Sequence, residues 1–117
     1  MLKKELRLNK QSAYTATYRV KNSHHRGGIT LFAGVKKKSD APTRAGFVVS
    51  KKTHKRAVKR NRLKRLMREA YRILLKENDT GNSQNYMSLI FVGHEKALGK
   101  SFEIVKKNIK HLLKELE

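Results

Sequence analysis

The sequence predicts an α/β fold, a two-layer sandwich in which helices pack against one sheet. Segments with the periods of strands and of helices alternate along the chain, and polar or glycine-containing turns separate them. The strand patterns lie at 28–35, 45–50 and 86–93, and the helical patterns lie at about 57–76 and from about 101 to the end. At 117 residues, the chain is expected to form one domain, 1–117, with a modest core.

The beginning of the chain leaves one choice open. The first eight residues are expected to be a loose basic lead-in. Residues 9–20 allow a helix, because Asn9 is a good N-cap and Tyr14 and Tyr18, four apart, would share a helix face. They also allow a strand, because alternate residues from Tyr14 to Val20 are apolar. Periodicity alone does not decide between the two.

Two strands are expected in the middle of the chain. In 28–35, the apolar residues at odd positions face one way, while Thr30 and Phe32 face the other, which is typical of a half-buried strand. Residues 36–44 hold the single proline and form a loop. The next strand follows at 45–50. Because the loop is short and sequential strands usually lie side by side, these two strands are expected to pair as neighbours.

The second half of the chain predicts a long helix, a buried strand and a closing helix. The long helix runs from about Ala57 to Lys76, and a polar turn at 76–85 separates it from the strand at 86–93. The apolar stripe of the long helix consists of Leu63, Leu66, Met67, Ala70 and Leu74. The stripe of the closing helix consists of Phe102, Val105, Ile109, Leu112, Leu113 and Leu116.

The net charge predicts a polyanionic partner. The chain has 29 Lys and Arg residues against 9 Asp and Glu residues, a formal charge of +20. Self-repulsion at such a charge lowers stability unless a partner neutralises it. Nucleic acid is the first candidate and an anionic membrane the second. The membrane is disfavoured, and no membrane partner is expected, because the chain has no Trp and the apolar stripe of its basic helix is needed for a core.

Composition also bears on the compartment. The absence of Cys excludes disulfides, thiolate catalysis and Cys-based zinc sites. No apolar run follows the charged N-terminus, so no signal peptide is expected, and no apolar stretch is long enough for a membrane span. The cytoplasm is the default expectation.

The segment 51–72, KKTHKRAVKRNRLKRLMREAYR, concentrates the charge. Eleven of its residues are Lys or Arg and one, Glu69, is acidic, so pairing within the helix cannot neutralise them. On a helical wheel, the face opposite the apolar stripe carries Asn61, Lys64, Arg65, Arg68 and Arg72, and Arg60 and Arg62 flank the stripe. The planar fork of arginine suits phosphate. Composition does not choose between a DNA groove and structured RNA.

The segment 45–72, AGFVVSKKTHKRAVKRNRLKRLMREAYR, resembles the signature region of the bacterial ribonuclease P protein subunit. The pattern that carries the resemblance consists of Arg60, Asn61, Arg62, Lys64, Arg65, Arg68 and Glu69. The resemblance implies an αβββαβα order with a four-stranded mixed sheet and a left-handed crossover, against the usual right-handed rule. It also implies a helix at 9–20 and a first strand near 20–26, where the residues themselves give only a weak strand signal.

The resemblance also implies the partners and the residues that contact them. The basic helix and its preceding turn would bind the catalytic RNA through Lys51, Lys52, Lys55, Arg56, Arg60, Asn61, Arg62, Lys64, Arg65, Arg68 and Arg72. A cleft between the first helix and the sheet would hold the 5′ leader of precursor tRNA on Tyr14, Tyr18 and Phe32. Many members have Phe at the two tyrosine positions. The stretch 24–28 departs from the family, so no leader or metal contact is carried over to Arg26.

The residues themselves contain no convincing nuclease site. Metal-dependent phosphodiester cleavage needs closely placed carboxylates, and the two aspartates, Asp40 and Asp79, are both expected in loops. The five histidines, His24, His25, His54, His94 and His111, lack metal-ligand spacing. This agrees with the resemblance, which implies one protein per catalytic RNA, magnesium for the RNA-catalysed reaction and no metal or cofactor on the protein. The alternatives are a ribosomal or chaperone-like RNA-binding protein and a DNA-binding helix domain.

Overall fold

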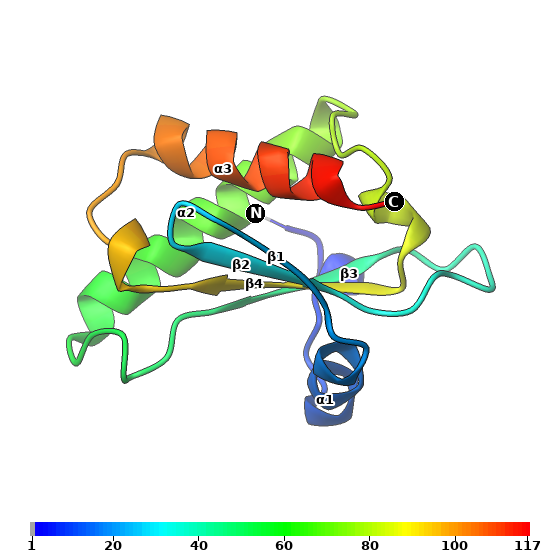
Figure 1. Cartoon of the computed structure of the whole chain (residues 1–117), viewed down its shortest axis with the longest axis horizontal. Helices are drawn as coiled ribbons and strands as arrows, with labels where there is room; N and C mark the ends of the chain where they lie inside the picture. The colour runs from blue at the N-terminus through cyan, green and yellow to red at the C-terminus, as the bar shows by residue number, and fades with distance from the viewer. Residues whose placement is uncertain (1) are drawn as a thin grey trace.

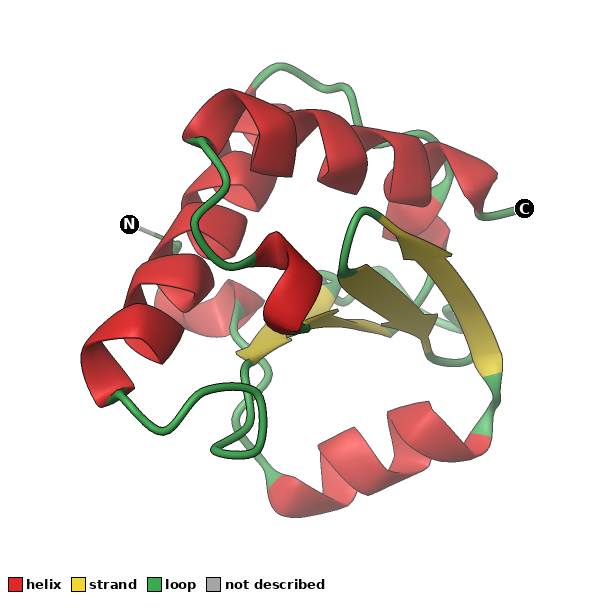
Figure 2. Cartoon of the chain, turned by 60° about the vertical axis from the view of Figure 1, so that its left-hand side comes forward, coloured by secondary structure: helices red, strands yellow, loops and turns green. Residues whose placement is uncertain are grey.

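The computed structural model describes residues 2–117, which form one four-stranded sheet with helices on both faces (Figure 1). Helices α2 and α3 cover one face, and the short helix α1 lies against the other (Figure 2). The elements are η1 (Lys4–Leu6), α1 (Gln11–Arg19), β1 (Asn22–Arg26), β2 (Ile29–Ala33), β3 (Arg44–Val48), α2 (Ala57–Lys76), η2 (Ser83–Asn85), β4 (Ser88–Gly93), η3 (Glu95–Ala97) and α3 (Phe102–Glu115). The predicted α/β class and element order are confirmed.

The strand order is β1-β2-β4-β3, so the expectation that β2 and β3 pair as neighbours is wrong. Strand β4 lies between them, antiparallel to β2 and parallel to β3. Leu89 pairs with Ala33 of β2 and with Ala45 of β3. The apolar run of β4 is buried on both faces, and such a strand belongs in the middle of a sheet. The hand of the β3–α2–β4 crossover stays a prediction.

Within residues 9–20, helix α1 covers Gln11–Arg19, so the strand alternative is wrong. The predicted cap is also wrong, because the N-cap is Lys10 and Asn9 precedes it. A contact with the sheet, made by the buried residue Thr17, favours the helix over the strand at this position. Its hydroxyl donates to the carbonyl of Ala13 at 2.8 Å and lies 2.6 Å from the hydroxyl of Ser88 on β4, which ties α1 to the sheet. Strand β1 then begins at Asn22, within the range that the resemblance implied.

Residues 2–8 pack against the sheet, so the expected loose lead-in is wrong for this part of the chain. Leu2 and Leu8 are buried, and η1 lies between them. Arg7 forms a parallel bridge with Ala45, and the backbone N–H of Leu8 donates to the Ala45 carbonyl at 2.9 Å. The apolar residues of this segment therefore cover the outer edge of β3, which would otherwise be a free strand edge.

Helix α2 has the predicted bounds, and its apolar stripe lies on the sheet. Four of the five predicted residues are buried and Leu66 packs against them. The structure adds Tyr71, which is fully buried beside Phe91 at a ring distance of 5.5 Å. Burial raises the pKa of Tyr71 to about 12, although the hydrogen bond that Gln84 donates to its oxygen opposes this. Phe47 stacks on Phe91 at 5.4 Å, so aromatic packing fixes α2 over β3 and β4.

Asp79 joins the turn after α2 to helix α3, and we expect this contact to be pH-dependent. Its carboxylate accepts from Lys110 at 2.9 Å and from Lys114 at 3.1 Å, and these two hydrogen bonds lower the pKa of Asp79. A lowered folded-state pKa means that the stabilisation is present above the ordinary pKa and is lost as pH falls through the folded value. Asp79→Asn should therefore lower the thermal midpoint slightly at pH 7 and by less at about pH 3, which lies below the ordinary pKa of an aspartate.

Thermal unfolding followed by circular dichroism at both pH values would measure this difference. Asp40→Asn is the matched control, because Asp40 has no ion pair among the residues that the structure describes. An equal decrease for Asp79→Asn at both pH values would contradict an electrostatic origin.

Candidate nucleic-acid interface

The outward face of α2 carries cations that lack acidic partners. Asn61, Arg62 and Arg65 are exposed and Lys64 is half-buried. Among the described residues, the one ion pair made by a cation of this helix joins Arg72 to Glu69. The remaining cations of the face therefore form an uncompensated positive surface, which is the electrostatic footprint of a polyanion site.

Arg72 and Glu69 neutralise each other at the end of this face. The Nε of Arg72 donates to both carboxylate oxygens at 3.1 Å. The Arg72 hydrogen bond lowers the pKa of Glu69, and the carboxylate raises the pKa of Arg72. The local ion pair expected for Glu69 is thus present, and Arg72 has less free charge to offer a partner than Arg62 or Arg65.

The turn before α2 is held in place by Arg60. Its Nη1 donates to the carbonyls of His54 at 2.7 Å and Lys55 at 3.1 Å, while the N–H of Arg56 donates to His54 Nδ1 at 3.0 Å. Arg60 is consequently half-buried, whereas the predicted turn residues are exposed. These residues are Lys51, Lys52, Lys55 and Arg56. Arg60 thus has a positioning role that the sequence did not reveal, and its guanidinium retains further donors.

Arg68 of α2 lies over the side chain of Phe47 on β3. Its guanidinium carbon is 5.9 Å from the centre of the Phe47 ring, a cation–π contact. Burial raises the pKa of Tyr14, and the charge of Arg68 opposes this shift. A hollow on the outward side of α2 is lined by Arg62, Arg65, Leu66, Arg68, Glu69 and Phe102. Phe102 was predicted only as a core residue, so the structure adds an aromatic wall beside the arginines.

The three predicted aromatic residues all lie on the α1 side of the sheet, but in two environments. Tyr18 and Phe32 meet edge to face, with ring centres 4.8 Å apart, and Tyr18 is 37% exposed. Tyr14 lies over β3 at Gly46, and its hydroxyl donates to the carbonyl of Leu8 at 3.0 Å. Burial raises the pKa of both tyrosines. Tyr18 and Phe32 therefore form an accessible aromatic pair, whereas Tyr14 mainly anchors α1.

Gly46 allows Tyr14 to reach this position, and we expect Gly46→Ala to destabilise the fold. A Cβ atom at Gly46 would lie 2.7 Å from the ring carbon that bears the Tyr14 hydroxyl. Overpacking of this kind costs about 1–3 kcal/mol in the free energy of unfolding. Denaturant unfolding of Gly46→Ala in the native and Tyr14→Ala backgrounds would measure the coupling. The penalty should shrink when the ring is absent, and equal penalties in both backgrounds would show that the ring is not its cause.

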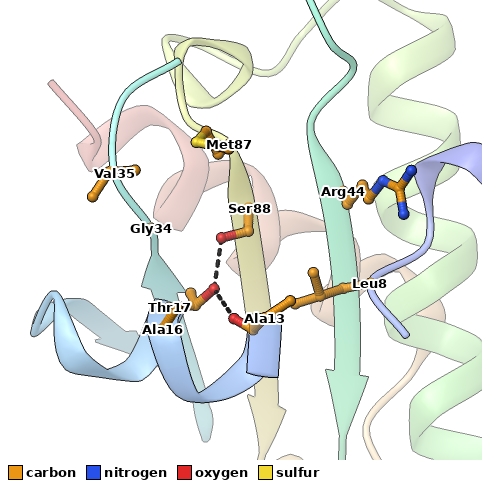
Figure 3. A pocket seen from close by; sticks show the side chains of 9 residues that line it. All are labelled: Leu8, Ala13, Ala16, Thr17, Gly34, Val35, Arg44, Met87 and Ser88. Atoms are coloured by element: carbon orange, nitrogen blue, oxygen red, sulfur yellow. Dashed lines mark hydrogen bonds between the residues drawn. The ribbon is translucent and has the colours of Figure 1, made fainter. Parts of the chain in front are cut away.

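A hollow of about 230 Å³ lies on the other side of α1, and the sequence did not predict it (Figure 3). Apolar groups form most of its wall, with Arg44 at one side and Val35 and Met87, each about half exposed, at the rim. The hydrogen bonds that join Thr17 to Ala13 and to Ser88 link three residues of its wall. None of the three predicted aromatic residues lines it. The Tyr18–Phe32 pair and this hollow are therefore separate features.

Two features are absent from residues 2–117. No group of three or more His, Asp or Glu side chains lies close enough together to hold a metal ion. No helix in this range is both long and apolar enough to cross a bilayer. That the protein itself holds no metal ion stays a prediction.

The fold and the charges define a small α/β protein with an uncompensated positive face on α2 and an exposed aromatic pair on the α1 side of the sheet. The protein-family model described as Ribonuclease P matches residues 2–117. The chain therefore belongs to the ribonuclease P protein family. The ribonuclease P protein component of Clostridium kluyveri is 31% identical over 92% of this chain and 91% of that protein. The component of Clostridioides difficile is 32% identical over 92% and 88%.

Solved structures show the same fold. The ribonuclease P protein of Staphylococcus aureus superposes with a TM-score of 0.77 at 22% identity, covering 95% of this chain and 94% of that one. The protein of Thermotoga maritima gives a TM-score of 0.76 at 22% identity, covering 95% and 97%. At this identity the likeness concerns the fold. It agrees with the four-stranded mixed sheet and the helices described above.

Proposed function

We propose that this chain is the protein subunit of ribonuclease P, the ribonucleoprotein that removes the 5′ leader from precursor tRNA. Membership of the family supports this role. The observation that carries the proposal is the uncompensated positive face of α2, which continues into the exposed basic turn at 51–56. We assign this surface to the phosphates of the catalytic RNA, with one protein bound to each RNA.

The RNA would carry the catalysis, with magnesium as its metal ion. The two aspartates are not arranged to hold a pair of metal ions. Asp79 is paired with two lysines of α3, and Asp40 lies in the β2–β3 loop. The contribution of this chain would be binding and orientation of the substrate. The Tyr18–Phe32 pair is suited to single-stranded RNA, because bases stack on exposed aromatic rings. A cytoplasmic location follows from this role.

Reconstitution with a bacterial ribonuclease P RNA tests the proposal. At low magnesium concentration, the RNA alone should cleave precursor tRNA slowly, and adding this chain should accelerate cleavage at the mature 5′ end. A basic protein of similar size and charge is the control for non-specific neutralisation. Equal stimulation by that control, or no stimulation by this chain, would contradict the proposal. Co-purification with ribosomal subunits, or a preference for one DNA duplex, would instead support the alternative RNA-binding or DNA-binding roles.

A further inference from the structure

Two histidines from distant parts of the sequence meet on one threonine. His25 Nδ1 and His94 Nε2 each lie 2.9 Å from the hydroxyl oxygen of Thr30, and the two imidazole rings are 5.7 Å apart. Strand pairing produces this arrangement, because His25 lies opposite Thr30. The backbone N–H of His94 donates to the carbonyl of Gly28 at 2.8 Å. This hydrogen bond places His94, which follows β4, beside the start of β2.

The histidine pair shares a sheet face with the aromatic pair. Ser23, Phe32 and Ile90 form one cross-strand row. The next row on the same face consists of His25, Thr30 and Val92, about 6.6 Å farther along the strands. Both histidines are exposed and Thr30 is half-buried. A ligand that stacks on Tyr18 and Phe32 therefore lies one cross-strand row from the histidine pair on the same face of the sheet.

The pair lies toward the basic turn. Strands β3 and β4 are parallel, so the end of β4 that leads to His94 is also the end from which β3 enters the turn at 51–56. Figure 1 shows this turn and the β1–β2 turn at the same end of the molecule. A strand of RNA that runs from the basic turn to Tyr18 and Phe32 would thus pass the histidine pair first.

The hydrogen-bond chemistry of the pair suits an anion. One nitrogen of each ring forms a hydrogen bond with the Thr30 hydroxyl. The other two, His25 Nε2 and His94 Nδ1, have no partner among the described side chains. A protonated imidazole donates from both nitrogens. Two protonated rings held by a shared hydroxyl would then each have one further N–H to donate to the oxygens of one phosphate group. Arg26 and Lys96, both exposed, add positive charge near this end, and Glu95 is the adjacent acid.

We propose that His25 and His94, held by Thr30, bind one backbone phosphate of the precursor tRNA leader, between the cleavage site and the bases on the aromatic pair. This inference rests on the proposed function. The contact assigns the leader a direction across the sheet, from the basic turn toward α1. It also gives Thr30 a positioning role, since its hydroxyl orients both rings.

A phosphate-neutralisation scan tests the assignment. The reconstituted ribonucleoprotein would be titrated with precursor tRNAs that each carry one methylphosphonate, an uncharged linkage, at a successive leader position. With the native chain, one position near the cleavage site should cost about tenfold in affinity. In the His25→Ala/His94→Ala variant, affinity for the unmodified substrate should fall by a similar factor, and neutralising that position should cost nothing more. Thr30→Val should give part of the same loss.

The controls separate the possible outcomes. His111→Ala, on the exposed surface of α3, should behave as the native chain. If every methylphosphonate costs the native chain and the double variant equally, the histidine pair binds no leader phosphate and the inference is overturned. It is also overturned if the position that couples to the histidines is farther from the cleavage site than those that couple to Tyr18. If the native ribonucleoprotein does not prefer precursor over mature tRNA, the proposed function itself fails.

Discussion

Replacing Arg62 and Arg65 together with alanine should weaken binding of ribonuclease P RNA about a hundredfold and flatten its salt dependence. Both arginines are exposed on the outward face of α2 and have no acidic partner among the described residues. A hydrogen bond to a charged group contributes about 1.5 kcal/mol, or about tenfold in affinity, for each arginine. Each lost phosphate contact should also reduce the slope of log K against log salt by about 0.7–0.9. Filter binding over a range of salt concentrations measures both quantities.

The matched control removes the same charge elsewhere. Lys100→Ala/Lys107→Ala neutralises two exposed lysines of the α3 region, and neither forms an ion pair in the described structure. This control should change the slope little. If both double variants lose affinity equally, net charge rather than the α2 face determines binding.

Arg68→Ala provides an internal comparison. Arg68 contacts the Phe47 ring and is half-buried, unlike Arg65. We expect Arg68→Ala to reduce the salt slope and also to lower the free energy of unfolding by about 0.5–1 kcal/mol, because a cation–π contact is lost. Arg65→Ala should leave the free energy of unfolding within about 0.5 kcal/mol of the native value. An unchanged slope for Arg65→Ala would count against a phosphate contact.

Tyr18→Ala and Phe32→Ala should each weaken binding of precursor tRNA without affecting mature tRNA. Stacking of a base on an aromatic side chain contributes about 1–3 kcal/mol, which corresponds to a loss of about five- to 150-fold. Because the two rings contact each other edge to face, removing one also exposes the other, and the double variant should lose less than the sum of the two. Titration of the reconstituted ribonucleoprotein with both tRNAs measures the effect.

Tyr14→Phe distinguishes the anchoring tyrosine from the stacking pair. It removes the hydroxyl that donates to Leu8 but keeps the ring over Gly46. We expect a loss of about 1 kcal/mol in stability and little change in the preference for precursor tRNA.

Equal losses for precursor and mature tRNA in Tyr18→Ala would refute the leader assignment.

Local periodicity predicted α2 well and α1 poorly, for a physical reason. Helix α2 is long and has a continuous apolar stripe, so its bounds follow from its own residues. Helix α1 is short, and the residues that attach it to the sheet are Thr17, through Ser88, and Tyr14, through Gly46. Those contacts connect distant parts of the sequence. The resemblance to the family, and not the pattern of apolar residues, therefore predicted this helix.

Strand pairing was the other point at which sequence reasoning failed. The rule that strands consecutive in sequence pair with each other is statistical. Here it fails, because the buried strand β4 lies between β2 and β3. The same pairing brings His25, Thr30 and His94 together. Spacing along the sequence could not reveal this cluster, because His94 and Thr30 become neighbours only through the register of the sheet.

The sequence by itself determined the element types from β2 onward, the family and the position of the positive face, because charge, apolar periodicity and motif spacing are properties of nearby residues in the chain. Only the tertiary structure decided the strand order, the ordered lead-in on β3, the separate roles of Tyr14 and Tyr18, and the histidine pair on Thr30. These features depend on contacts between segments far apart in the chain. Such contacts are set by how buried surfaces fit together, and a linear pattern does not contain that information.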